Sequence, residues 1–422
     1  MKTKRIFSFL TSAVCAVSLV SATALSVGAD ELIDTPLKYG DLSYARIDED
    51  EDGTFDYIEI TACDTAVTEI EVPSEIEGLP VASIGVHGFS ACRSLETVVL
   101  PDTIIKIGNC AFFACKSLKN INLPDSLTDM DGSVFLECSG LESIVIPESI
   151  TNIKGSTFHG CLSLTDITIP ESVENVGKFA FKYTPWLKNK QAENPLVIVN
   201  DVLVDGTTCE GDVVIPDGIR RIANSAFDDC SALTNVTIPD SVVFIDEWAF
   251  SACSGLENIN FPDSVTEIKW GAFWDCTGLK NVVIPESVTD LGCYVFAECT
   301  SLESVTIENP ECYLDNDEGL FSNTYNEEDD SYSFDGTIYG HWASTAHEYA
   351  LENNRKFETI NGVVPGDMTG DSQLNLYDAI EIAKCIMESR ELTDEEKAIA
   401  DYNSDGVVNL YDVIEIAKII MG

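Results

Sequence analysis

Hydrophobic and polar positions repeat along most of this chain with a period of 23 residues. Within one unit, the run from Leu118 to Leu123 alternates apolar and polar side chains as a short strand does, and Pro124 ends it. A compact turn that carries a phenylalanine and a cysteine completes the unit, and only the stretch around 193–215 is irregular. The period is marked by Pro101, Pro124, Pro147, Pro170, Pro216, Pro239, Pro262 and Pro285, and by Phe89, Phe112, Phe135, Phe158, Phe181, Phe227, Phe250, Phe273 and Phe296.

A unit of this length cannot bury its own apolar face, so the copies are expected to stack into a solenoid with one continuous core. The repeated Leu, Ile and Phe positions then form ladders in that core. The strand positions that point outward form a small, polar, aromatic-free row, which suits hydrogen bonding to a protein more than stacking on sugars. This row comprises Thr97, Asn120, Ser143, Asp166, Asn235, Asn258, Asn281 and Ser304.

The segment from Ile238 to Val242, followed by Ala249-Phe250, Cys253 and Leu256, resembles the BspA-like leucine-rich repeat. This resemblance covers about 72–308. It implies an α/β solenoid of leucine-rich repeats with parallel strands, used for adhesion or protein recognition. Residues 340–360 are similar to the segment that closes such arrays, so we expect an N-terminal cap at 30–71 and a C-terminal cap at 309–361.

A different pattern occupies the C-terminal region, where an acidic loop occurs twice, 34 residues apart, each time before an apolar-periodic helix. Calcium takes six to eight oxygen ligands, and alternate positions of these loops supply them. A capping box between Thr393 and Glu396 predicts a further helix between the two loops. The expected ligands are Asp367, Thr369, Asp371, the Gln373 carbonyl and Asp378 in the first loop, and Asp401, Asn403, Asp405, the Val407 carbonyl and Asp412 in the second.

The first loop has threonine at its third position and Ser372 where the second loop has the turn glycine Gly406, so we expect the first site to be weaker. Two loops that each end in aspartate, with no helix before them, resemble a type I dockerin over about 364–422, within a domain expected at 362–422. That resemblance implies a small all-α domain that binds two Ca²⁺ ions and docks into a cohesin of a scaffoldin. It also implies two cohesin-contacting quartets, Leu376, Tyr377, Ala383 and Lys384 in the first half, and Leu410, Tyr411, Ala417 and Lys418 in the second.

Other dockerins often have Ser-Thr where this chain has Leu-Tyr, which leaves the cohesin class open. The alternative for Leu376 and Leu410 is that they pack inside the domain. Because the two quartets are identical, either half is expected to be able to face the cohesin.

The chain also holds a third acidic loop, in which Asp48, Asp50, Asp52, Gly53, Asp56 and Glu59 match the EF-hand spacing. Its flanks, Tyr44–Ile47 and 57–61, alternate as hairpin strands and not as helices. We therefore favour an acidic hairpin tip and keep calcium binding there as the alternative.

Charge and the N-terminus set the expected location. The 24 basic and 72 acidic residues give a formal charge of −48, which argues against nucleic acid and anionic membranes as partners. Residues 1–29 have the basic start, apolar middle and small-residue end of a signal peptide. No later apolar run is long enough to span a bilayer. We expect a secreted, extracellular protein, either associated with a cellulosome or at the cell surface.

Cysteines and tryptophans each allow two interpretations. Cys92, Cys115, Cys138, Cys161, Cys230, Cys253, Cys276 and Cys299 share one slot of the repeat. Stacked copies favour a row of free buried thiols over disulfides, because parallel side chains disfavour closure. Trp248, Trp270 and Trp274 lie on the turn side, either half-buried or as an aromatic patch for a partner.

No catalytic motif occurs, and we expect a non-catalytic recognition subunit whose solenoid binds a protein ligand. The alternatives are a component that adheres to polysaccharide and, third, a divergent hydrolase.

Overall fold

The computed structural model describes residues 36–315, 319–326, 331–342, 344–360, 364–369, 374–388, 390–403 and 406–421, and every structural statement below concerns these residues. The predicted signal peptide lies outside them. Among the described residues, no helix is both long and apolar enough to cross a membrane.

The fold begins with an antiparallel hairpin of β2 (Leu42–Ile47) and β3 (Tyr57–Cys63), which confirms hairpin flanks around the third acidic loop. Strand β3 then pairs in parallel with β6 (Leu79–Ile84), and the repeating array continues from there. The remaining short strands of this region are β1 (Leu37–Tyr39), β4 (Glu69–Glu71) and β5 (Glu75–Ile76).

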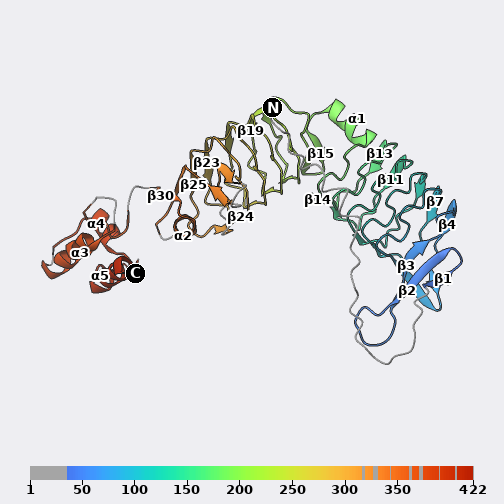
Figure 1. Cartoon of the computed structure of the whole chain (residues 1–422), viewed down its shortest axis with the longest axis horizontal. Helices are drawn as coiled ribbons and strands as arrows, with labels where there is room; N and C mark the ends of the chain where they lie inside the picture. The colour runs from blue at the N-terminus through green and yellow to red at the C-terminus, as the bar shows by residue number, and fades with distance from the viewer. Residues whose placement is uncertain are drawn as a thin grey trace. The chain divides into compact units, whose positions relative to one another are not determined.

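Each repeat contributes two short parallel strands, and each strand pairs with its counterpart 23 residues away (Figure 1). One row of strands comprises β8 (Lys106–Ile107), β10 (Asp129–Met130), β12 (Asn152–Ile153), β14 (Asn175–Val176), β18 (Arg221–Ile222), β20 (Phe244–Ile245), β22 (Glu267–Ile268), β24 (Asp290–Leu291) and β26 (Tyr313–Leu314). The other comprises β7 (Thr97–Val99), β9 (Asn120–Ile121), β11 (Ser143–Val145), β13 (Asp166–Thr168), β17 (Gly211–Val214), β19 (Leu233–Thr237), β21 (Asn258–Asn260), β23 (Asn281–Ile284) and β25 (Ser304–Ile307).

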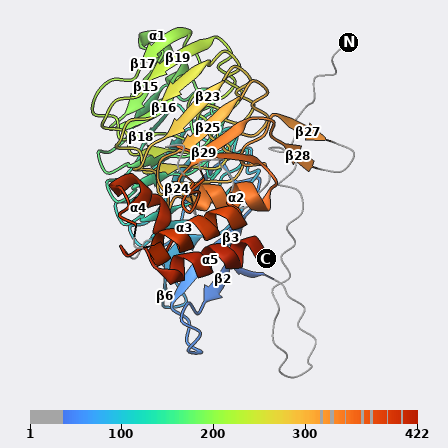
Figure 2. The same ribbon diagram turned by 90° about the vertical axis from the view of Figure 1, so that its left-hand side faces the viewer.

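These strands are shorter than the sequence predicts, since β9 covers only two residues of the alternating run 118–123. The side chains predicted to point outward, from Thr97 to Ser304, lie on the second row of strands and are exposed or half-buried. Figure 2 shows several members of this row side by side, from β17 to β29 (Thr337–Gly340).

The core consists of ladders of identical side chains. Phe112 is fully buried and stacks on its neighbours one repeat away, with ring centroids 5.0 and 5.5 Å apart. The thiol of Cys115 donates a hydrogen bond of 3.0 Å to the carbonyl of Phe89, one repeat earlier, and Cys276 makes the same contact with Phe250. All fourteen described cysteines are free, so the ladder holds thiols and not disulfides.

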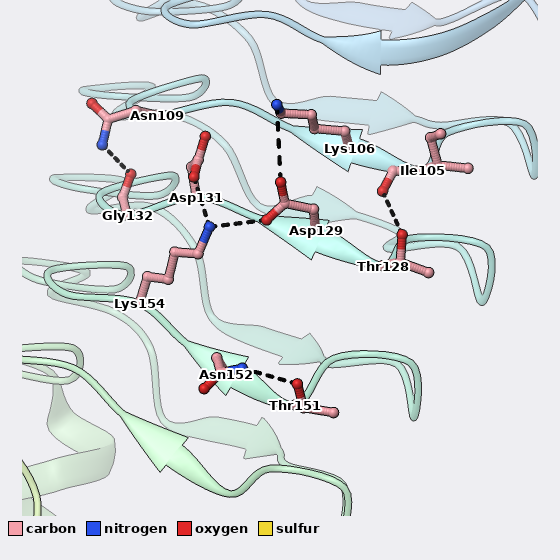
Figure 3. Close-up of polar contacts among 10 residues, drawn as sticks. All are labelled: Ile105, Lys106, Asn109, Thr128, Asp129, Asp131, Gly132, Thr151, Asn152 and Lys154. Atoms are coloured by element: carbon pink, nitrogen blue, oxygen red, sulfur yellow. Dashed lines mark hydrogen bonds and ion pairs between the residues drawn. The ribbon is translucent and has the colours of Figure 1, made fainter.

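Polar contacts between successive repeats also follow the period (Figure 3). The Asn109 amide donates to the Gly132 carbonyl 23 residues on, at 2.8 Å. Lys154 reaches back to both Asp129 and Asp131, at 2.9 and 2.7 Å. Such exposed pairs add little stability each, and they follow the register that the paired strands set.

The turns of the repeats place non-glycine residues in the left-handed region at two positions four residues apart. In one turn these are His87 and Ala91, with φ of 60° and 59°, and in the next Cys110 and Ala114, with φ of 55° and 57°. Backbone hydrogen bonds to the following turn hold this costly conformation, as in the bond from Ala91 N–H to the Phe113 carbonyl at 2.7 Å.

The irregular slot of the sequence contains the helix α1 (Pro185–Glu193) and the antiparallel pair β15 (Val197–Val199) and β16 (Val202–Asp205). Thr184 caps α1 by accepting from the Leu187 N–H. The Trp186 ring packs at a tilt of 44° against Phe181 of the phenylalanine ladder, with ring centroids 4.6 Å apart.

The array closes with β29 and β30 (Lys356–Thr359), which continue the second row, and with the helix α2 (Thr345–Glu352), whose N-cap is Ser344. A hairpin of β27 (Thr324–Asn326) and β28 (Ser331–Ser333) precedes them.

The C-terminal region contains three helices, α3 (Leu376–Glu388), α4 (Asp394–Ala400) and α5 (Leu410–Met421), and α3 packs against α5 (Figure 2). The predicted capping box at Thr393 and Glu396 is confirmed. Helices α3 and α5 begin three residues before Ala379 and Val413, where the apolar period predicts their starts. The Asn375 side chain accepts from Tyr377 N–H, which caps α3 ahead of the loop aspartate.

Candidate calcium loops and docking surface

The last aspartate of each acidic loop lies in the first turn of the following helix and is fully buried. Asp378 is the third residue of α3 and Asp412 the third of α5, and both have an exposed fraction of 0%. Each carboxylate closes its own loop by accepting backbone N–H groups. Asp378 accepts from Asn375 at 2.8 Å, and Asp412 accepts from Asn409 at 2.7 Å. The two halves are therefore built alike.

In the first loop, three of the predicted ligands converge. The Thr369 hydroxyl oxygen lies 3.1 Å from a carboxylate oxygen of Asp367 and 2.9 Å from one of Asp378. Asp367 is also buried, with an exposed fraction of 8%. Two buried carboxylates thus meet around one hydroxyl group, where two negative charges repel each other unless a cation is present.

The second loop brings its ends together in the same way. Asp412 accepts from the Asn403 N–H at 3.2 Å, and Asp401 accepts from the Gly406 N–H at 2.7 Å. Gly406 has a φ of 84°, the left-handed turn that the sequence assigns to it. The Asn409 side chain donates to the Val407 carbonyl at 2.7 Å. Ion pairs to Asp378 or Asp412 do not occur in the described part of the chain.

The donor chemistry of both loops fits calcium. The described ligands are carboxylate, hydroxyl, amide and carbonyl oxygens, the hard donors that this ion prefers. Three of the predicted ligands, Asp371, Gln373 and Asp405, lie outside the described residues.

The surface at the start of α3 and α5 is apolar and exposed. Leu376 and Tyr377 have exposed fractions of 60% and 75%, and Leu410 and Tyr411 have 59% and 68%. The alternative that the two leucines pack inside the domain is therefore wrong. Side chains exposed to this extent contribute little to the core, and an aromatic and aliphatic pair repeated in both halves is typical of a contact surface.

The other members of the predicted quartets follow one to two helical turns later. Ala383 and Ala417 are half-buried, whereas Lys384 and Lys418 are exposed and pair with Glu381 and Glu415, at 2.9 and 2.6 Å. Ile380 and Ile414 were not predicted as part of the contact surface, but both are 40% exposed on the same helices. Their identical places in the two halves of the sequence were the signal that could have found them.

The third acidic loop brings together Asp48, Asp50 and Asp56, whose carboxylate oxygens lie within 4.8 Å of one another. The loop is held by its own backbone, since Asp48 accepts from the Gly53 N–H at 2.9 Å and Asp56 accepts from the Glu49 N–H at 2.8 Å. Exposed acidic groups adopt such turns without a metal, so both interpretations of this loop remain.

The tryptophans of the turns contact one another and are half-buried. Trp248 lies 4.1 Å from Trp270 and 4.7 Å from Trp274, between ring centroids. Lys178 lies over the ring of Trp248 at 5.1 Å. This packing favours a role in the turn stack over an exposed aromatic patch.

The stacked repeats and the duplicated loop-helix units together place the protein in one class, the leucine-rich-repeat solenoids that carry a dockerin. Comparison with known families agrees. The BspA type leucine rich repeat region matches residues 62–202 and 206–327, more than half of the chain, and the dockerin type I domain matches residues 365–421. The chain belongs to the BspA type leucine-rich-repeat family and contains a type I dockerin domain.

Among solved structures, the chain is similar to a leucine-rich-repeat protein of T. pallidum, with 29% identity over 53% of this chain and 91% of that one, at a TM-score of 0.36. A leucine-rich cell surface protein of Faecalibacterium prausnitzii shares 24% identity over 68% of this chain and 92% of its own, also at 0.36. The pneumococcal vaccine antigen PcpA shares 17% identity over 76% and 98%, at 0.41. A search of curated proteins found no match.

Both families are non-catalytic, and a dockerin implies a cohesin as its partner. The chain therefore combines a leucine-rich-repeat solenoid with a cellulosome-type docking domain.

Proposed function

We propose that this protein is a secreted, non-catalytic recognition subunit. Its dockerin binds a cohesin of a scaffoldin in a calcium-dependent way, and its solenoid binds a protein ligand outside the cell. The domains assigned to these tasks are residues 362–422 for docking and 72–308 for recognition, with caps at 30–71 and 309–361.

The observation that carries the proposal is the exposed apolar surface repeated at the starts of α3 and α5. Leu376 with Tyr377, and Leu410 with Tyr411, are exposed by more than half, at the same two places of both helices. Aromatic side chains with aliphatic neighbours are the usual centres of protein interfaces. The sequences of the two helices from these positions, 376–387 and 410–421, differ at only two places, 379 and 385 in the first helix.

Calcium supports docking by shaping this surface. Asp378 and Asp412 stand two residues after the exposed leucines and belong to both the loop and the helix. An ion held by the loop therefore fixes the first turn of each helix. The proposed ligands are those given by the sequence, Asp367, Thr369, Asp371, Gln373, Asp378, Asp401, Asn403, Asp405, Val407 and Asp412.

The test is titration of the full chain and of its variants against a panel of cohesins, in calcium and in EDTA. If either half can face the cohesin, Tyr377→Ala or Tyr411→Ala alone weakens binding by about twofold, because one of two equivalent modes is lost. The double variant loses both anchors and weakens binding by about 30-fold or more, the effect of a 2 kcal/mol hot spot.

Val145→Ala is the matched control, since Val145 is an apolar side chain on the solenoid with an exposed fraction of 63%. It should leave cohesin affinity unchanged. Binding that is equal in EDTA, or a double variant with the affinity of the parent chain, would contradict the proposal.

The solenoid's contribution is supported by the polar outward row. Asn235 and Asn258 face each other on the paired strands β19 and β21, Asn281 begins the next strand of the row, β23, and all three are exposed. Amides spaced along a flat, rigid surface suit hydrogen bonds to a protein backbone. Capture of a protein by the solenoid, with polysaccharide unbound, is the expected outcome of a pull-down, and retention on insoluble polysaccharide would instead support the adhesion alternative.

A further inference from the structure

In one repeat of the solenoid, the turn between the two strands is shortened. The strand residue Leu203 pairs with Ile222, and Gly211 pairs with Leu233 in the other row. The chain thus goes from the first row to the second in eight residues, from 203 to 211, where the next repeat takes eleven, from 222 to 233. The family match is also interrupted here, between residues 202 and 206.

The shortened turn leaves a cleft of about 940 Å³ between the turn that ends at Tyr183 and the turn that contains Asp228. Helix α1 forms another side of it, through Leu187 and Gln191. The aromatic core beneath the cleft is closed, because Trp186 covers Phe181 and the backbone at Gly206 lies against the Phe227 ring. The cleft is therefore a feature of the turn surface and not a hole in the core.

One wall of the cleft presents backbone donors that have no partner. In the preceding turn, the N–H groups of Ser156, Phe158 and Gly160 donate to the carbonyls of Lys178, Ala180 and Lys182, at 2.8, 2.8 and 2.9 Å.

Phe179, Phe181 and Tyr183 occupy the same three positions one repeat later, and all three line the cleft. Within the residues that the structure describes, their N–H groups have no acceptor. The corresponding donors of the preceding turn pair with the next turn, so three free donors in one row offer an edge to which a chain of carbonyl groups can add, as at an unpaired strand edge.

The opposite wall is acidic. Asp228 and Asp229 line it, and Asp205 lies between the walls, where it accepts from Gln191 at 2.9 Å. Burial raises the pKa of Asp205 and of Asp228, while the Lys178 and Lys182 ammonium groups act against that rise at Asp228. Asp229 is exposed, so the outer part of this wall has a carboxylate available to a basic group.

We propose that this cleft binds a turn-forming peptide segment of the solenoid's protein ligand, which takes the place of the missing turn. Carbonyl groups at alternate residues of the segment accept from the N–H groups of Phe179, Phe181 and Tyr183. A basic side chain of the segment faces Asp229. The proposal deepens the recognition role proposed above for the solenoid and locates it at one place in the array.

The chain supplies its own probe for this site. Residues 176–183, Val-Gly-Lys-Phe-Ala-Phe-Lys-Tyr, contain the three carbonyls that the preceding turn uses, together with two lysines and no cysteine. A fluorescently labelled peptide of this sequence is titrated with the full chain by fluorescence anisotropy, beside a scrambled peptide of the same composition. Saturable binding of the first peptide is expected, with the scrambled one weaker by about tenfold, which corresponds to roughly one hydrogen-bonded contact.

Two variants of the full chain test the location. Thr207→Trp fills the cleft, and Asp229→Lys reverses the charge of its outer wall; each should weaken the peptide by about tenfold or more. Glu298→Lys is the matched control, because Glu298 has the same place in a turn three repeats further on and a φ of 58°. It should bind the peptide as the parent chain does, and circular dichroism melting verifies that the variants are folded.

The proposal is overturned if both variants bind the peptide as well as the parent chain. It is overturned as well if neither this peptide nor a phage-displayed peptide library yields saturable binding. Binding of a neutral oligosaccharide that Thr207→Trp abolishes would also overturn it. Cohesin binding is measured on the same samples. If the parent chain binds the peptide but no cohesin, the docking function alone is contradicted. If it binds a cohesin but not the peptide, the cleft proposal alone is contradicted.

Discussion

Removal of calcium should unfold the dockerin and leave the solenoid intact. Among the described residues, the hydrophobic core cluster of the C-terminal region has only four buried members, Ala379, Ile382, Ala400 and Ile416. The solenoid has two continuous clusters with many more such residues, including its phenylalanine and cysteine ladders. A domain with so small a core depends on other sources of stability, and bound ions are the obvious one here.

The size of the effect follows from the two loops. An ion present at about 100 times its Kd stabilises the folded state by about 2.7 kcal/mol, so two sites supply roughly 5 kcal/mol. A domain that covers residues 365–421 has a total stability of about 3–9 kcal/mol, at roughly 0.05–0.15 kcal/mol per residue. Loss of both ions therefore removes most of it. Asp378 and Asp412 add to the effect, because they would remain buried with uncompensated charge.

The chain allows the two parts to be followed separately. All five tryptophans lie between 186 and 342, so tryptophan fluorescence reports on the solenoid alone. Three of the five described helices are α3, α4 and α5, so the helical circular dichroism signal reports mainly on the dockerin. In EDTA the helical signal should be largely lost at 25 °C, while the thermal transition seen by tryptophan stays where it is in calcium.

The double variant Asp378→Asn, Asp412→Asn should behave in calcium as the parent chain does in EDTA. The reasoning is refuted if EDTA leaves the helical transition unchanged, or if the tryptophan transition shifts with it to the same extent.

Three further predictions concern the solenoid. In urea titrations, Phe250→Ala should lower the free energy of unfolding by about 3–5 kcal/mol, and Phe89→Ala should lower it by about 1 kcal/mol less. The difference is expected because Phe250 stacks on two rings, at 4.9 and 5.0 Å, whereas Phe89 stacks on one among the described residues. Equal losses would contradict the ladder. Burial raises the pKa of Cys161 to about 12, so the folded state keeps a proton that the unfolded state loses above a pH of about 8.5. Stability should therefore fall from that pH towards 12, and Cys161→Ala should reduce the slope by up to one proton, an unchanged slope being the contrary result. Gly206→Ala puts a methyl group 2.2 Å from the Phe227 ring and should cost about 1–3 kcal/mol, whereas a stability equal to that of the parent chain would show that the ring can move.

The period of 23 was sufficient to predict the solenoid, because each repeat forms its structure through local pattern and through identical neighbours. A position that is apolar in every copy, such as the one held by Phe112 and Phe135, has to face the core in every copy. The hairpin at β2 and β3 and the capping box at Thr393 were predicted for the same reason, since their signals lie within a few residues. The loop ligands follow from spacing alone, and several of them do converge in the structure.

Three features could be determined only from the tertiary structure. The exposure of Leu376 and Leu410 depends on how α3 packs against α5, which the amphipathic pattern of one helix does not specify. The sequence marked the slot around 193–215 as irregular, but only the fold reveals that Trp186 closes the core there. The cleft beside it exists because the turn between two others is shortened. A gap between segments far apart in the chain has no local pattern of hydrophobic and polar residues that could predict it.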